Sequence, residues 1–196
     1  MAAGKVLQSD LPLPMLDLSK NYFELFGLPA EYQVEIPALR DRYRELQGAV
    51  HPDRYATGSD EEKRKALQAA AYVNEGFDTL KNPLLRAQYL LSLHSINMEL
   101  REETTKDAAF LMQQLEMREE LEALRHTGEG LDSVGEFMDR VSGMIKALVS
   151  RISVDFETPS KENLDDARET VRKMQFLNKL YAEAQAVEAQ LEEEFG

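Results

Sequence analysis

Apolar residues recur at intervals of three and four along most of the chain, and this spacing predicts α-helices. One such stripe consists of Ile36, Leu39, Tyr43, Leu46 and Val50, and a second consists of Ala66, Ala70, Val73, Phe77 and Leu80. Two stripes of matching period that are joined by a short loop predict an antiparallel helical hairpin. No segment shows the alternation of apolar and polar residues that is typical of strands, so the sequence predicts an all-α fold.

Start and stop signals place the remaining helices. Gly27 and Pro29 close a short apolar helix over residues 21–28, and Ser59 with Glu62 predicts a capping box at the start of the helix after the loop. A further apolar segment, residues 82–93, is expected to be helical and to connect two regions. Three longer helices are predicted at about 105–126, 133–153 and 161–195, and they form a three-helix bundle.

The distribution of charge supports a division into two modules. The net charge of the chain is −13, with 11 basic and 14 acidic residues in 1–100 against 12 and 22 in 101–196. Regions that differ this much suit different partners. We therefore predict a flexible extension over 1–18, a hairpin domain with its connecting helix over 19–95, and a C-terminal helical bundle over 96–196.

Composition excludes several classes of function. An acidic chain without a concentrated basic patch is a poor nucleic-acid binder, so no nucleic-acid partner is expected. The absence of cysteine excludes disulfides and thiolate metal sites. No apolar run could span a membrane, and no signal peptide is visible, so we expect a cytoplasmic protein. No nucleophile–base pair, phosphate loop or metal-ligand spacing occurs, which predicts neither an enzyme nor a cofactor.

The loop of the hairpin carries His51-Pro52-Asp53. Proline disfavours helical geometry at the residue before it and fixes its own φ, so the helix should end at His51 in a stiff turn. Asp53 can accept backbone hydrogen bonds or stay exposed and meet a cation. In isolation this tripeptide is most often an ordinary helix stop.

The helix that leads into the loop gives the tripeptide a different context. At 100° per residue, Arg40 and Arg44 line one edge of the apolar stripe that leads to His51, and Arg42 lies on the opposite shoulder. A basic strip that ends in a rigid tip with a carboxylate suits docking to an acidic protein surface. An exposed tip does not suit catalysis, which needs a pocket.

The first C-terminal helix has two apolar faces. Phe110, Met117, Leu121 and Leu124 share one direction, which is sufficient for a three-helix core. Leu111, Met112 and Leu115 point elsewhere, beside glutamates. Such a helix is either buried on both faces or presents an apolar patch with an acidic rim to a partner. In the last helix, Phe176 points away from the early core stripe and is a plausible binding anchor.

Several stretches together resemble a known family. "NYFELFGL", "HPDRY" and "AAYVNEGFDTLKNPLLRAQYLLSL" resemble a J-domain, and "DAAFLMQQLEMREELEAL" and "TVRKMQFLNKLYAEAQ" are similar to the C-terminal helices of the HscB family. The resemblance runs from about residue 19 to residue 195. That family comprises J-domain co-chaperones of iron–sulfur cluster assembly. The cysteine zinc site that eukaryotic members often carry is absent here.

The resemblance implies two partners. A J-domain docks on a DnaK-type chaperone, here HscA, and stimulates its ATP hydrolysis, so the protein would be an activator and not an enzyme. The residues this implies are His51, Pro52 and Asp53, with Arg40, Arg42 and Arg44 as electrostatic support. The C-terminal module of the family binds the cluster scaffold protein IscU. The positions that match its binding surface are Leu111, Met112, Leu115, Glu116, Glu119 and Phe176, whereas a further acidic position of the pattern is Ala123 here.

The sequence is compatible with two alternative functions. The chain could be a general J-domain protein whose C-terminal module delivers a different client, such as an unfolded polypeptide. It could also be a structural helical adaptor in which His51-Pro52-Asp53 is only a turn. A sharp preference for IscU over unfolded peptide would argue against the general J-domain protein. Stimulation of a DnaK-type ATPase would argue against the structural adaptor.

Overall fold

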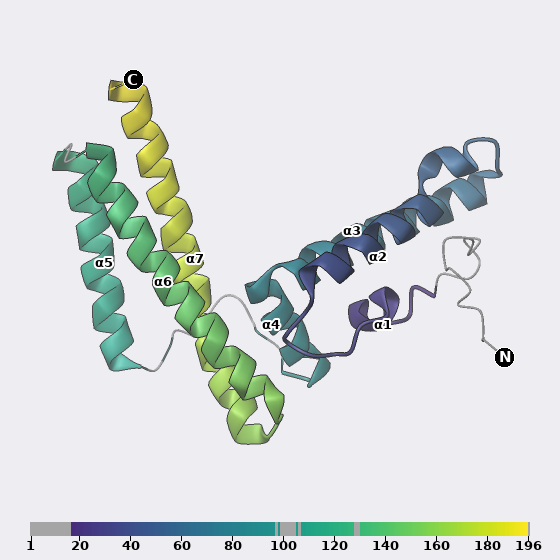
Figure 1. Cartoon of the computed structure of the whole chain (residues 1–196), viewed down its shortest axis with the longest axis horizontal. Coiled ribbons are helices and arrows are strands. Elements are labelled where there is room, and N and C mark those ends of the chain that lie inside the picture. Colours follow the sequence, from purple (N-terminus) through teal and green to yellow (C-terminus); the bar gives the residue numbers. More distant parts are fainter. Residues whose placement is uncertain (1–16, 97, 99–104, 106, 128–129, 196) are drawn as a thin grey trace. The chain divides into compact units, whose positions relative to one another are not determined.

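The chain forms two helical units in a computed structural model that describes residues 17–96, 98, 105, 107–127 and 130–195. The units are Met1–Leu90 and Leu91–Gly196. Every regular element of the described residues is helical, which confirms the predicted all-α class (Figure 1). The elements are α1 (Tyr22–Phe26), α2 (Ile36–Val50), the 3-10 helix η3 (Pro52–Tyr55), α3 (Asp60–Lys81), α4 (Pro83–Leu93), α5 (Ala108–Thr127), α6 (Gly130–Glu157) and α7 (Lys161–Phe195).

The helix ends of the first unit follow from local sequence signals. The Ser59 side chain accepts a hydrogen bond from the backbone N–H of Glu62 while the Glu62 carboxylate accepts one from the N–H of Ser59, which confirms the predicted capping box. Asn21 and Glu24 form a second capping box at α1. Gly27 ends α1 with φ +65°, a left-handed conformation that glycine adopts without steric cost.

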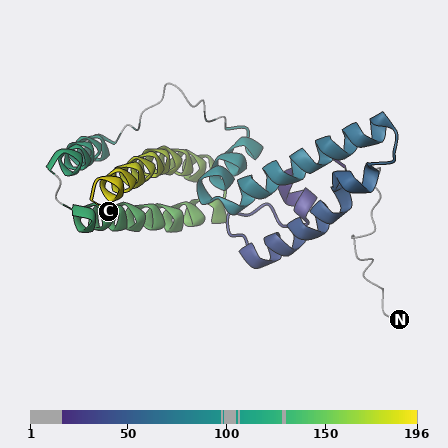
Figure 2. The same ribbon diagram turned by 90° about the horizontal axis from the view of Figure 1, so that it is seen from above.

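The predicted hairpin is formed by α2 and α3, which lie side by side (Figures 1 and 2). Leu39 and Leu46 of α2 and Val73 of α3 are almost fully buried. The rings of Tyr43 and Phe77 stack with centroids 4.0 Å apart, which adds an aromatic contact to the aliphatic core of the hairpin.

The short helix α1 approaches α3 very closely at Gly76. A Cβ atom at this position would lie 2.9 Å from Cδ1 of Tyr22 and 3.0 Å from Cε2 of Phe26. In addition, the backbone N–H of Tyr22 donates to the hydroxyl of Tyr89 over 2.9 Å. The glycine, which costs helix propensity inside α3, is therefore the residue that lets α1 reach the hairpin.

The second unit is built on α6 and α7, which run antiparallel and carry α5 against them. Figure 2 shows α6 and α7 side by side. The core combines residues from all three helices: Phe110, Met117, Leu121 and Leu124 of α5, Val134, Phe137 and Val141 of α6, and Leu177, Leu180, Ala184, Val187 and Leu191 of α7. The stripe predicted for α5 is thus confirmed as its core face.

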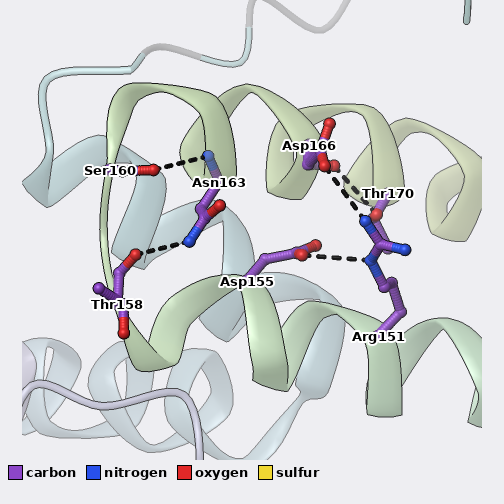
Figure 3. Close-up of polar contacts among 7 residues, drawn as sticks. All are labelled: Arg151, Asp155, Thr158, Ser160, Asn163, Asp166 and Thr170. Atoms are coloured by element: carbon purple, nitrogen blue, oxygen red, sulfur yellow. Dashed lines mark hydrogen bonds and ion pairs between the residues drawn. The ribbon is translucent and has the colours of Figure 1, made fainter.

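A polar network spans the turn between α6 and α7 (Figure 3). Arg151 donates from Nε to Oδ1 of Asp155 at 3.2 Å and from Nη2 to Oδ2 of Asp166 at 3.1 Å. The Ser160 hydroxyl accepts the backbone N–H of Asn163 at 3.1 Å, near the start of α7. The helix α6 ends at Glu157, whereas the sequence predicted an end near residue 153, where the apolar stripe stops. The additional turn carries Asp155, which the contact with Arg151 holds in place.

One carboxylate of this network is poorly solvated. Asp155 is only 5 % exposed, and its Oδ2 has no hydrogen-bond partner in the structure. Burial raises the pKa of Asp155 above its ordinary value, and the opposing contact with Arg151 does not compensate. The ionised form therefore destabilises the folded state relative to the neutral form.

We predict that Gly76→Ala destabilises the first unit. Overpacking costs typically about 1–3 kcal/mol, which exceeds the roughly 1 kcal/mol that alanine adds in helix propensity. Urea unfolding should show a lower free energy of unfolding. Gly48→Ala in α2 is the matched control, because a Cβ atom there meets nothing within 4 Å, so this variant should be at least as stable as the parent. Equal stabilities of the two variants would contradict the close approach of α1.

We predict that Asp155→Asn stabilises the second unit at neutral pH. A raised folded-state pKa means that the folded chain holds this proton more tightly than the unfolded chain, so stability falls as pH rises through the interval between the two values. The advantage of the variant should therefore grow from pH 4 to pH 7 in urea unfolding. Asp166→Asn, at the exposed end of the same Arg151 contact, controls for loss of the ion pair. An advantage that shrank with rising pH would refute the sign.

Candidate functional sites

The tip of the first hairpin is formed by His51, Pro52 and Asp53. His51 ends α2 with φ −59° and ψ 128°, as the following proline predicts. Its Nδ1 accepts the backbone N–H of Asp53 at 3.3 Å and lies 3.6 Å from Oδ2 of the same residue. Because Nδ1 accepts that N–H, the neutral ring carries its hydrogen on Nε2. The Asp53 side chain is 90 % exposed, so its carboxylate is presented to solvent on a constrained turn.

Two residues after the tripeptide tie the tip to the end of α2. Nη1 of Arg54 donates to the carbonyl of Gly48 at 3.0 Å, and the Tyr55 hydroxyl donates to the carbonyl of Ala49 at 3.1 Å. The last carbonyls of a helix have no partner within the helix, so these contacts satisfy acceptors that would otherwise need water. Sequence reasoning missed both positioning residues. The signal available was a basic residue four positions after the last residue of α2.

The three predicted arginines of α2 differ in their surroundings. Arg42 contacts Glu45 at 2.6 Å and Arg44 contacts Asp41 at 2.7 Å, each within the same helix. Arg40 is exposed and forms no ion pair or hydrogen bond within the part of the chain that the structure describes. The side chain of Arg42 is 21 % exposed and that of Arg44 is 74 % exposed. The exposed Arg44–Asp41 pair contributes at most about 1 kcal/mol, so a stronger partner can displace it.

The second apolar face of α5 is exposed. Leu111, Met112 and Leu115 are 38 %, 60 % and 52 % exposed, whereas the core residues of the same helix are less than a tenth exposed. This confirms that α5 is not buried on both faces. Glu116 and Glu119 are exposed beside the leucines and give the face an acidic border. Three neighbouring large apolar side chains of this exposure are more than the scattered apolar residues of an ordinary surface.

Phe176 lies differently from the sequence expectation. Its ring packs edge-on against Phe110 of α5, with centroids 5.9 Å apart, and the guanidinium of Arg118 lies 5.5 Å from its centroid. The residue is half-buried against the core cluster. The core stripe of α7 turns around the helix along its length because the later part packs on α5 as well as α6. Phe176 thus forms a half-covered edge of the α5 surface rather than a free anchor.

These geometries suit binding rather than bond-making chemistry. Among the described residues, no three His, Asp or Glu side chains lie close enough to hold a metal ion. None of the helices in the described part of the chain combines the length and hydropathy that a bilayer crossing requires. The two sites are a stiff charged tip on the first unit and an apolar surface with acidic edges on the second.

A helical hairpin with a His-Pro-Asp tip, joined to a three-helix unit, defines a J-domain co-chaperone. Known proteins agree with this class. Residues 106–185 match the family described as HSCB C-terminal oligomerisation domain. The co-chaperone protein HscB homolog of Shewanella woodyi is 40 % identical over 168 residues, which cover 86 % of this chain and 97 % of that protein.

Solved structures show the same similarity. The chaperone HscB from Vibrio cholerae has a TM-score of 0.77 at 37 % identity, with 88 % of this chain and 99 % of that chain covered. The human co-chaperone protein HscB has a TM-score of 0.80 at 26 % identity, with 95 % and 93 % covered. The chain belongs to the HscB family of co-chaperones. It is a co-chaperone of iron–sulfur cluster biogenesis, as the resemblance implied, and not itself an enzyme.

Proposed function

We propose that the protein binds the iron–sulfur scaffold IscU, delivers it to the DnaK-type chaperone HscA in the cytoplasm, and stimulates ATP hydrolysis by HscA. The observation that carries the first half is the exposed apolar face of α5, which has no role in the core of its own unit. The observation that carries the second half is the constrained tip at His51-Pro52-Asp53. The domain limits predicted from the sequence, 19–95 and 96–196, remain part of this proposal.

The tip is suited to an electrostatic docking role. Its exposed Asp53 carboxylate can accept hydrogen bonds from a cation of the chaperone, and the turn around it is already ordered, so little conformational entropy is lost on binding. Behind the tip, Arg40, Arg42 and Arg44 can approach an acidic surface. Complementary charge of this kind raises the association rate and fixes orientation more than it raises affinity.

The α5 surface is suited to holding a protein client. Its centre consists of Leu111, Met112 and Leu115, and its border is acidic through Glu116 and Glu119. Apolar anchors surrounded by polar residues are the usual arrangement of a protein interface. Phe176 adds ring surface at the edge next to Phe110. A particular folded client is favoured over unfolded chains because the patch is small and its acidic border discriminates by charge.

We predict that His51→Gln or Asp53→Asn abolishes stimulation of HscA while leaving the fold intact. Both side chains are exposed, so their replacement removes docking contacts without disturbing the core. Steady-state ATP hydrolysis by cognate HscA should rise with the parent protein and return to the basal rate with either variant. Asp78→Asn, an exposed aspartate of α3 roughly 25 Å along the helix from its start, is the matched control. Undiminished stimulation by both tip variants would contradict the assignment of His51 and Asp53 to chaperone docking.

We predict that the triple variant Leu111/Leu115/Phe176→Ala weakens IscU binding at least tenfold, because it removes two apolar anchors of the α5 face and the half-buried ring at its edge. Titration calorimetry with IscU measures this loss. The variant should still stimulate HscA in the absence of IscU, since the tip is untouched. IscU should raise HscA hydrolysis further with the parent protein and not with the variant.

Two further variants control for a loss of stability in the triple variant and for a general loss of exposed apolar side chains. Leu111/Leu115→Ala keeps the half-buried Phe176 and so separates binding from any loss of stability. Leu131/Val154→Ala removes exposed apolar side chains elsewhere in the second unit and should bind IscU normally. Parent-like affinity in the triple variant would refute the surface, and equal binding of unfolded peptide would point to a general client.

A further inference from the structure

A groove runs along the flank of α5 that faces α6. Its volume is about 680 Å³, within the roughly 300–1,000 Å³ typical of binding clefts. Its walls include Met112, Gln113 and Glu116 of α5 and Met144, Ala147 and Leu148 of α6. Leu177 and Lys173 of α7 also line the groove, where the charge of Lys173 is paired with Asp107. This flank of α5 lies on the other side of the helix from Phe176, because positions 112, 113 and 116 project about 100° or more away from Arg118, which covers the Phe176 ring.

Besides the buried apolar stripe that attaches α5 to its unit, two polar contacts tie the helix to its neighbours. At its beginning, Oδ2 of Asp107 contacts Nζ of Lys173 of α7 at 2.6 Å. Further along, Glu120 forms an ion pair with Arg140 of α6. Between these two contacts α6 presents Ala147, whose side chain is a single methyl group, so the space beside it is left open.

The groove is continuous with the surface proposed to bind the scaffold. Met112 and Glu116 belong to both, since they form the lip of the groove and the edge of the exposed α5 face. Ala147 is exposed and Met144 and Leu148 are half-buried, so the apolar wall of α6 is reachable from solvent. A ligand that covered Met112 would cover the opening of the groove as well.

We propose that the groove between α5 and α6 is part of the scaffold-binding surface and receives an apolar segment of the scaffold that carries neighbouring basic residues. Met144, Ala147 and Leu148 of α6 are then contact residues in addition to those of α5. This inference rests on the proposed function, because it extends the same interface from the exposed face of α5 onto α6.

Charge selects this occupant over a second copy of the chain. Residues 101–196 contain 22 acidic and 12 basic residues, and the carboxylate of Glu116 at the lip forms no ion pair with any of the described residues. A second copy would bring another acidic surface to this lip, and like charges placed opposite one another disfavour association. A basic segment of a different protein would instead pair with Glu116. Self-association, which the description of the matching family names, is the competing occupant.

The test fills the groove without removing any contact. Ala147→Trp places a large ring in the space, and Ala182→Trp is the matched control on an exposed position of α7. Titration calorimetry with cognate IscU should give a dissociation constant at least fivefold higher for Ala147→Trp and an unchanged one for Ala182→Trp. Gln113→Trp fills the groove from its other wall and should also weaken binding, which keeps the test valid if Ala147→Trp unfolds at a lower temperature.

The outcomes separate this inference from the proposed function. If Leu111/Leu115/Phe176→Ala loses IscU and both groove variants bind within fivefold of the parent, the groove inference is overturned and the α5 surface stands. If the triple variant keeps its affinity, the proposed surface itself fails. Sedimentation of the protein without IscU measures self-association. A groove variant that changes self-association but not the affinity for IscU would assign the groove to a second copy of the chain and overturn the inference.

Discussion

The contact between the residues after the tip and the last carbonyls of α2 is the constraint on which the first site depends. Without the side chains of Arg54 and Tyr55, the carbonyls of Gly48 and Ala49 would lose these partners, and the loop would keep only the hydrogen bonds within its own turn. With them, the turn that carries Asp53 becomes an extension of the helix end. The hairpin core fixes the direction of α2, and α2 in turn fixes where the carboxylate is presented.

In the second unit the decisive feature is that α5 uses only one of its apolar faces internally. Burial of Phe110, Met117, Leu121 and Leu124 attaches the helix, with each fully buried side chain of this size contributing roughly 1.5–3 kcal/mol. Leu111, Met112 and Leu115 stay 38 %, 60 % and 52 % exposed, so they contribute less to the core, and neighbouring exposed apolar side chains of this size are typical of an interaction surface. The stability of the unit and its proposed binding role thus come from opposite sides of one helix.

The sequence predicted the helices well because their signals are local. The Ser59–Glu62 capping box, the end of α2 at His51 and the two stripes of the hairpin all depend on residues within a few turns of one another. Contacts between distant segments were not predictable in this way. The approach of α1 to Gly76 depends on a packing that no periodicity reveals, and Phe176 was placed by a stripe that assumed a single packing partner for α7. The groove beside Ala147 likewise depends on the spacing between α5 and α6, which local sequence signals do not predict.

The division of charge between the units has a consequence for how the two proposed partners share one chain. The arginines of α2 suit an acidic chaperone surface, and the glutamates around α5 suit a basic client segment. Each partner is therefore repelled by the site meant for the other, so neither competes for the wrong one. Because both sites lie on one polypeptide, a bound client is held at high effective concentration near the chaperone, and delivery gains affinity without any direct contact between the sites. Specific delivery then requires only that each unit keep its own charge and its own anchor residues.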